Sequence, residues 1–292
     1  MRTQISGFIV FSLISCSLLS CQKDQKPSET HSIFSMDNLV AWCIIPYDNQ
    51  NRTPQERAVM LNELGFTKMA YDWRNEHLPL LPEEIHTLRE HNIDLTSVWI
   101  WVDQRASDGF LPEHDFIFET LENEEVSTRI WIGVHENFYE DLPDDEKVQH
   151  VAEMVKRIYE RVQSSGSSVS LYNHQGWLGI PENQVLVIEA SGIDDIGIVF
   201  NFHHGHAEID RFEEALGIMM PWLETVNLNG MEKEGAHILD IGKGDYEKAM
   251  IKTLIESGYS GNIGIIGHTD GEDVRMVLER NLEGLYEILG EI

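Results

Sequence analysis

The chain has few cysteines, few basic residues and only one long apolar run, which lies at its N-terminus. Three cysteines occur among 292 residues, and 21 lysines and arginines stand against 50 aspartates and glutamates, so the formal net charge is −29. A chain this acidic repels polyanions, which excludes nucleic acids and anionic lipid headgroups as partners. Because 42% of the residues are hydrophobic, the rest of the chain is able to close a substantial core.

The first twenty residues have the composition of an export signal. Arg2 is followed by an apolar run over residues 5–19, and the sequence turns polar directly after Cys21. The tetrad Leu18-Leu19-Ser20-Cys21 resembles the lipobox of bacterial lipoproteins, in which the signal is cut before a cysteine whose thiol carries the lipid. An ordinary secretory signal that contains a cysteine is the alternative.

The lipobox resemblance implies that Cys21 is lipidated and that the membrane is a partner through this anchor only. Gln22 follows the cysteine, which favours the outer membrane, with the protein on the periplasmic or cell-surface side. Residues 21–37 are rich in Gln, Lys, Ser and Pro and are predicted to be a flexible tether after a signal peptide over 1–20. Only Cys43 then remains in the folded domain. An internal disulfide is excluded, and Cys43 is expected to be a buried structural thiol.

From residue 38 onward, short β-branched and aromatic runs alternate with longer segments of helical period. This alternation is typical of βα units around a parallel sheet. Eight such units over residues 38–292 favour an α/β fold with a single (β/α)₈ TIM barrel over a doubly wound sheet, because the glycine-rich first turn of the latter is absent. The strands are expected near 39–45, 67–71, 95–101, 129–132, 169–172, 196–202, 225–228 and 263–266. The helices are expected near 54–64, 82–91, 113–122, 144–164, 181–190, 208–220, 246–257 and 272–289.

Histidines concentrate directly after the expected strands, where the loops of such a barrel form the active site. Seven of the 13 histidines follow strands, and three of them share one loop. Imidazole is both a metal ligand and a general acid or base near neutral pH. The seven are His77, His135, His174, His203, His204, His206 and His268.

Carboxylates and aromatic rings follow the same strands. The acids Asp48, Asp72, Asp103 and Glu136 are candidate bases or acceptors for sugar hydroxyls. Flat rings stack on the C–H faces of sugars, whereas Trp99 and Trp131 are expected to be barrel core. The aromatic residues at these strand ends are Trp73, Trp99, Trp101, Tyr172, Trp177 and Phe202.

Several short segments together resemble the sugar phosphate isomerase/epimerase superfamily, whose fold is a xylose isomerase-like TIM barrel. They are Tyr47-Asp48 with Leu64-Gly65, Leu171-Tyr172-Asn173-His174, the run 197–204, Val226-Asn227-Leu228-Asn229, the run 242–245 and the run 258–261. The resemblance implies a divalent metal at the barrel mouth and a bound carbohydrate. The usual ligands follow strands five to eight as Glu, Asp with His, His, and Glu. The matching positions here are Tyr172, Asn201 with His204, Asn227, and Gly267 beside His268, so only His204 matches.

Two arrangements are compatible with these replacements. One divalent ion, Zn²⁺ or similar, could be held by four histidines, with Glu136 in reserve. Alternatively there is no metal, the histidines act as acid and base, and Asn173, Asn201, Asn227 and Asn229 bind hydroxyls. The number of imidazoles favours the metal. The four expected ligands are His174, His204, His206 and His268.

The resemblance and the site residues favour an enzyme that acts on an unphosphorylated sugar or keto-sugar by removing a proton next to a carbonyl. The outcome is isomerisation, epimerisation, or elimination and hydration by a lyase or hydratase. A non-catalytic sugar-binding lipoprotein is the alternative, while the acidic charge argues against a nuclease. The expected catalytic residues are His174, His204 and Glu136. The expected substrate-binding residues are Asp48, Asp72, Arg74, Trp101, Asn173, Trp177, Asn201 and Asn227.

The lipobox makes a prediction about the mature N-terminus. We expect the mature chain to begin at a lipid-modified Cys21, and Cys21→Ala to leave an unlipidated precursor. Mass spectrometry of the protein purified from membranes measures both. A soluble, unmodified form that starts at another residue would contradict the prediction.

Overall fold

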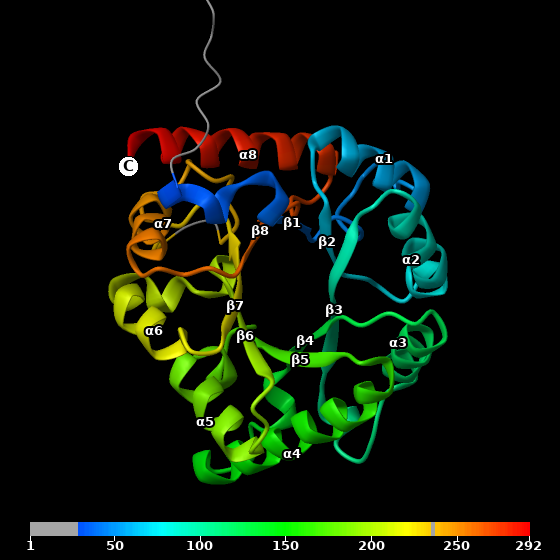
Figure 1. The fold of residues 1–292 in the computed structure, drawn as a ribbon. Coiled ribbons are helices and arrows are strands. Elements are labelled where there is room, and N and C mark those ends of the chain that lie inside the picture. The colour runs from blue at the N-terminus through cyan, green and yellow to red at the C-terminus, as the bar shows by residue number, and fades with distance from the viewer. Residues whose placement is uncertain (1–28, 235–236) are drawn as a thin grey trace, which may run out of the picture.

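Eight parallel strands close into a barrel in the computed structural model, which describes residues 29–234 and 237–292 (Figure 1). Each strand pairs with the next along the chain, and β1 pairs with β8 to close the sheet. The predicted (β/α)₈ barrel is therefore confirmed. The strands are β1 Leu39–Trp42, β2 Lys68–Tyr71, β3 Asp94–Val102, β4 Arg129–Val134, β5 Ser168–Tyr172, β6 Ile196–Asn201, β7 Leu223–Leu228 and β8 Asn262–Ile266.

A ring of helices surrounds the barrel, with one helix between each pair of successive strands and α8 after the last (Figure 1). Each expected helix has a counterpart. The sixth begins later than expected because the segment His206–Arg211 forms a 3-10 helix, η9, instead of an α-helical first turn. The helices are α1 Pro54–Leu64, α2 Leu81–Glu90, α3 Pro112–Asn123, α4 Asp144–Val162, α5 Pro181–Ser191, α6 Phe212–Met219, α7 Glu247–Glu256 and α8 Val274–Glu291.

Helix α1 shows how local sequence sets an element's limits. The Thr53 hydroxyl accepts from the backbone N–H of Glu56, and the Glu56 carboxylate accepts from the backbone N–H of Thr53. These two bonds satisfy amides that an α-helix leaves free at its N-terminus. The helix ends at Gly65, whose φ of 88° is open to glycine at little cost. Thr53 and Glu56 thus form a capping box.

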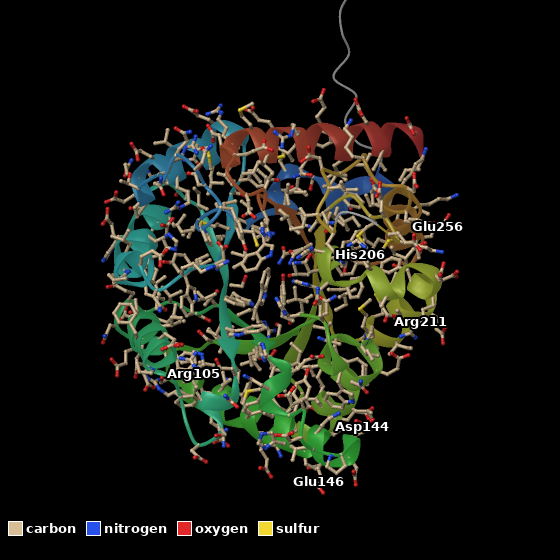
Figure 2. The ribbon with its side chains drawn as sticks, turned by 180° about the vertical axis from the view of Figure 1, so that it is seen from behind. Arg105, Asp144, Glu146, His206, Arg211 and Glu256 are labelled. Carbon is tan, nitrogen blue, oxygen red and sulfur yellow. The ribbon has the colours of Figure 1, made fainter. Side chains whose placement is uncertain are left out.

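The barrel interior is filled by a separate group of apolar side chains, because alternate residues of each strand point inward. Side chains from the strands fill the middle of the ring (Figure 2). The ring centroids of Trp42 and Trp131 lie 4.9 Å apart, and those of Trp131 and Tyr172 lie 6.1 Å apart. We call these three residues the aromatic plug. The larger apolar core lies between the sheet and the helices.

Part of the segment expected to be a tether packs on the barrel instead. Phe34 is 2% exposed and belongs to the main core, and the carbonyl of Ile33 accepts from the Asn38 amide at 2.8 Å. The apolar residues Ile33 and Phe34 supply a reason to fold that the polar composition before them lacks. The predicted signal peptide and Cys21 lie outside the described residues. Within the described part of the chain, none of the helices is long and apolar enough to cross a membrane.

A buried ion pair joins α1 to α2. The Arg57 guanidinium donates to the Glu84 carboxylate at 3.0 and 3.1 Å, and both side chains are almost fully buried. Removing one partner from such a pair leaves an uncompensated charge away from water. This pair therefore holds the first two helices in register against the barrel.

We expect Glu84→Gln to lower the free energy of unfolding by about 3 kcal/mol, because it leaves the Arg57 charge buried without a counterion. Urea denaturation followed by circular dichroism measures the change. Glu83→Gln is the matched control: it removes an exposed carboxylate from the same helical turn and should have little effect. Equal effects of the two substitutions would contradict the assigned role of the pair.

Candidate active site at the barrel mouth

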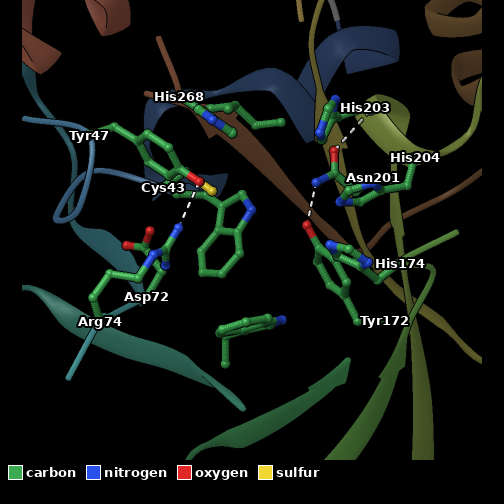
Figure 3. A pocket seen from close by; sticks show the side chains of 13 residues that line it. Cys43, Tyr47, Asp72, Arg74, Tyr172, His174, Asn201, His203, His204 and His268 are labelled. Carbon is green, nitrogen blue, oxygen red and sulfur yellow. Dashed lines mark hydrogen bonds between the residues drawn. The ribbon is translucent and has the colours of Figure 1, made fainter. Parts of the chain in front are cut away.

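A cavity of about 110 Å³ opens at the carboxyl ends of the strands, directly above the aromatic plug. Two groups of polar side chains face each other across it (Figure 3): one from the β1 and β2 ends, the other from the β5 and β6 ends. We call it the histidine cavity. It is lined by Trp42, Cys43, Tyr47, Asp72, Arg74, Trp99, Tyr172, His174, Asn201, His203, His204, Ile266 and His268.

Asp72 is the one carboxylate among the lining residues that the structure describes. It follows β2 directly and is 3% exposed. Burial raises the pKa of Asp72 to about 7, and the nearby Arg74 charge offsets part of that rise. Within residues 29–234 and 237–292, the carboxylate has no side-chain hydrogen-bond partner. Asp72 can therefore both accept and release a proton near neutral pH.

The Arg74 guanidinium is engaged by groups other than the Asp72 carboxylate. Its guanidinium donates to the Tyr47 hydroxyl at 2.8 Å and to the carbonyl of Trp73 at 2.7 Å, and it lies over the Tyr47 ring. These contacts fix the cation at the edge of the cavity without a direct hydrogen bond to Asp72. Arg74 therefore lies near Asp72 but does not engage its carboxylate in an ion pair.

Three imidazoles form the opposite side of the cavity. The ring of His204 lies 4.2 Å, centroid to centroid, from both His174 and His203. Burial lowers the pKa of all three, and neighbouring imidazoles lower them further; the value for His174 is about 4. They are consequently neutral at pH 7. The Nδ1 of His204 has no hydrogen-bond partner in the described part of the chain.

Tyr172 and Asn201 complete this side. The side-chain amide of Asn201 donates to the Tyr172 hydroxyl. The side-chain oxygen of Asn201 accepts from the backbone N–H of His203 at 3.1 Å. Burial raises the pKa of Tyr172, so its hydroxyl stays protonated. That proton is free to be donated to an oxygen of a ligand, while Asn201 sets the position of the hydroxyl.

His268 and Cys43 lie at the β8 and β1 ends. The His268 ring stacks on Tyr47 with centroids 3.5 Å apart, and burial lowers its pKa to about 4. Cys43 was expected to be a buried structural thiol, yet it lines the cavity and has a positive φ of 56°. Burial raises the pKa of Cys43, so the group is a neutral thiol and not an activated nucleophile.

The two strand tryptophans that were expected to be core differ in position. Trp131 is buried in the aromatic plug, which confirms that expectation. Trp99 is only partly buried and lines the histidine cavity, so its assignment to the core alone was wrong. Trp99 pairs with Trp131 in the β3–β4 register, but its ring packs beside Trp73 and Trp101, with centroids 6.3 and 5.6 Å away, instead of within the aromatic plug.

Several residues expected to bind substrate instead hold the loops in place. The Asp48 carboxylate accepts from the Arg52 guanidinium at 2.7 Å, and Arg52 also pairs with Asp273 before α8. The Asn173 amide group donates to the Asn201 carbonyl and accepts from the Asn201 N–H, which joins the ends of β5 and β6. Their hydrogen-bonding groups are committed to the protein.

Three further candidates lie away from the histidine cavity. Asn227 is fully buried, and its side chain occupies the space over Gly264 inside the barrel. Trp177 packs beside Tyr139, with ring centroids 5.6 Å apart. Glu136 is exposed against Gly176. Trp101 also lies outside the histidine cavity. It lines a neighbouring cavity at the barrel mouth, and its ring centroid is 4.5 Å from that of His174.

The four histidines expected to bind a metal do not converge. The ring nitrogens of His206 lie 2.7 Å and 3.0 Å from the carbonyl oxygens of Glu232 and His237, and His268 is stacked on Tyr47. Among the described residues, no group of three or more His, Cys, Asp or Glu side chains is arranged to hold a metal ion. Because an amide, a tyrosine and a glycine also stand at the three positions where the resemblance in the sequence led us to expect carboxylate ligands, the residues present do not fit a divalent ion.

Tyr47, Tyr172, Cys43 and His203 are cavity residues that were not among the predicted site residues. Each has a signal in the sequence, because each stands at a strand end or in the loop that follows it. Tyr172 replaces a family metal ligand, and His203 adjoins His204. What the sequence does not show is which side chains of a loop turn inward.

Comparison with known proteins places the fold. No known protein family and no curated protein matches the sequence. Among solved structures, 3-keto-D-glucoside 4-epimerase from E. coli aligns with a TM-score of 0.65 at 15% identity, covering 86% of this chain and 98% of that one.

Two further structures align over a similar length, and one carries the name of the fold. A xylose isomerase-like TIM barrel protein from Mycobacterium smegmatis, in complex with magnesium, has a TM-score of 0.59 at 13% identity and covers 86% of this chain and 96% of its own. The IOLI protein with a bound zinc atom has a TM-score of 0.66 at 11% identity, with 87% and 98% covered. The fold of this chain is therefore a xylose isomerase-like TIM barrel.

The buried imidazoles predict a loss of stability in mild acid. His174 and His268 have pKa values of about 4, below the ordinary 6.5, so falling pH protonates the unfolded chain first. The stability that they contribute is present above pH 6.5 and is lost as the pH falls to 4. Asp72 has a raised pKa, so it makes the folded state more stable as the pH falls from 7 to 3.8. It is one group, however, against several imidazoles. We expect the urea midpoint to fall between pH 6.5 and 4.

His204→Asn should make this fall in the urea midpoint less steep, since it removes one buried imidazole of the cluster. The matched control is His86→Asn, which replaces a histidine whose side chain is 62% exposed. A midpoint that is independent of pH over this range, or equal slopes for the two variants, would contradict the assignment.

Proposed function

We propose that this protein is a sugar epimerase that acts on an unphosphorylated keto-sugar, with Asp72 as the general base. The observation that carries the proposal is a buried carboxylate with a pKa of about 7, facing neutral imidazoles across a cavity at the barrel mouth. A base works best when its pKa lies near the operating pH, because it is then both ionised and a strong proton acceptor. The solved structure of a 3-keto-D-glucoside 4-epimerase with this fold is consistent with the proposal.

The reaction begins with removal of a proton from the carbon next to a carbonyl. The Asp72 carboxylate takes the proton, and the electron pair of the C–H bond moves to the carbonyl oxygen, which becomes an enolate. Neutral imidazoles and the Tyr172 hydroxyl are suitable donors to that oxygen, because they lose no proton to solvent at pH 7. The developing negative charge is thereby stabilised in a site with little water.

The positions of these groups favour epimerisation. β6 is four strands from β2 in the closed barrel, so Asp72 and His204 approach a bound sugar from opposite sides (Figure 3). A planar enolate that loses its proton to one side and regains a proton from the other has the inverted configuration. His174 and His204 are the groups placed for this second proton transfer: one of them takes a proton from solvent as the enolate charge forms beside it and delivers that proton to the carbon, and Asp72 returns the proton it removed to solvent after the product leaves.

The charges of the cavity favour a neutral sugar. Arg74 is the one permanently cationic side chain among the described lining residues, and its guanidinium is engaged by Tyr47 and Trp73. A phosphorylated sugar needs several free cationic or backbone N–H donors. Together with the net charge of −29, this argues for an unphosphorylated substrate.

The lipobox-like tetrad supports a location outside the cytoplasm. A lipid anchor at Cys21 would hold the barrel at the periplasmic or cell-surface side of the membrane. There the protein would meet sugars released from glycans. The proposal for the reaction does not depend on this location.

We expect Asp72→Asn to slow the exchange of the substrate's α-proton with deuterated water by roughly 10³-fold, because it removes the base and keeps its shape. Proton NMR of a keto-hexopyranoside incubated with the enzyme measures this exchange. In the wild type, kcat/KM should rise with pH through about 7 as Asp72 ionises, and the variant should lack this rise.

Asp108→Asn is the matched control, since Asp108 is an exposed acid in the loop after β3 and lies outside the histidine cavity. Full activity of Asp72→Asn would exclude Asp72 as the base. A wild-type protein that binds the sugar without exchanging its proton would instead be the non-catalytic binding protein, which the replacement of the expected carboxylate ligands also allows.

A further inference from the structure

A second cavity adjoins the histidine cavity and is larger, at about 520 Å³. The two share Arg74, Trp99 and His174, so a ligand in one is in direct reach of the other. The proposed reaction uses only the first cavity. The second is lined by Trp73, Arg74, Asn75, Glu76, Trp99, Trp101, Arg105, Glu113 and His174.

Two tryptophans form a flat surface in this second cavity. Trp99 and Trp101 lie on the same side of β3, with ring centroids 5.6 Å apart and an interplanar angle of 27°. Neither ring is fully buried, so each presents part of its surface to the cavity. Partly exposed, nearly parallel indoles at a cavity wall are suited to the C–H face of a sugar ring or to an aromatic group.

The surrounding chain holds these indoles rigidly. A Cβ atom on Gly133 of the neighbouring strand would lie 2.8 Å from Trp101 and 3.0 Å from Trp99, so only glycine leaves them room. The Trp73 indole N–H donates to the Trp99 carbonyl at 2.7 Å, and a His114 ring nitrogen lies 2.9 Å from the Trp101 carbonyl. A surface fixed before binding costs a ligand little conformational entropy.

The second cavity has no surplus of either charge. Its described lining contains two arginines and two glutamates. Arg105 pairs with Asp103 at 2.8 Å and approaches Glu113 at 3.6 Å, which leaves it little capacity for a carboxylate or sulfate group. The occupant is therefore a neutral group with flat apolar faces.

We propose that the second cavity binds the aglycone or neighbouring sugar of a glycoside, so that the substrate is a keto-glycoside and not a free monosaccharide. This rests on the proposed function for the reacting ring. A glycoside cannot open its ring at the anomeric carbon, so the carbonyl that activates the C–H bond must be a ring ketone. An oxidoreductase that converts a ring hydroxyl to a ketone must then supply the substrate.

The test compares a methyl and a phenyl 3-ketoglucoside as substrates in the deuterium-exchange assay. We expect wild-type kcat/KM to be about tenfold higher for the phenyl glycoside, because its ring can stack on the indoles. Trp101→Ala should reduce this ratio to near one, and Trp101→Phe should keep most of it. Trp222→Ala, at a half-buried tryptophan before β7 on the other end of the barrel, should leave the ratio unchanged.

A second measurement separates this inference from the proposed function. Calorimetric titration with unoxidised phenyl glucoside reports binding without catalysis. If no keto-glycoside exchanges deuterium but phenyl glucoside binds and Trp101→Ala weakens it, the reaction is wrong and the second cavity is still a glycoside subsite. The subsite is overturned, even where exchange is observed, if the wild type shows equal kcat/KM for the methyl and phenyl 3-ketoglucosides and equal affinity for the unoxidised methyl and phenyl glucosides.

Discussion

The site depends on the aromatic plug that closes the barrel directly beneath it. Trp42, Trp131 and Tyr172 fill the barrel interior below the cavity, so the groups above are covered from below by packed aromatic rings. Charged forms lose stability without water, which moves the pKa of a carboxylic acid up and that of an imidazole down. Asp72 and His174 shift in these opposite directions for the same reason. One packing feature thus sets both halves of the proposed proton chemistry.

Closure of the sheet meets the second requirement of the proposed reaction. The base and the proton donors must lie on opposite sides of the substrate. Groups that follow β2 and β6 face each other across the mouth because four strands separate them in a ring of eight. The loops need rigidity to keep this geometry, and here polar residues provide it. Asp48 anchors the first loop through Arg52, and Asn173 ties β5 to β6. Some polar residues at the barrel mouth are therefore available for the reaction, whereas others hold the loops in place.

That division explains how far the sequence could predict the site. Strand and helix limits follow from periodicity and caps, as Thr53 and Gly65 show, and position after a strand correctly brought Asp72 and His204 to the mouth. Side-chain direction is different, because it depends on tertiary contacts. His206 turns toward two loop carbonyls, and Asp48 turns toward Arg52, although both stand at strand ends. Spacing alone contains no information about these partners.

The scarcity of carboxylates in the described lining of the histidine cavity has a consistent electrostatic consequence. A barrel that binds a divalent ion needs several carboxylates to balance its charge, whereas the described lining of this cavity has Asp72 alone, near an engaged arginine and neutral imidazoles. An added dication would find little negative charge there, and it would lower the pKa of Asp72 and weaken it as a base. Without the ion, the enolate must be stabilised by hydrogen-bond donors. Tyr172 is such a donor, because burial keeps its hydroxyl protonated.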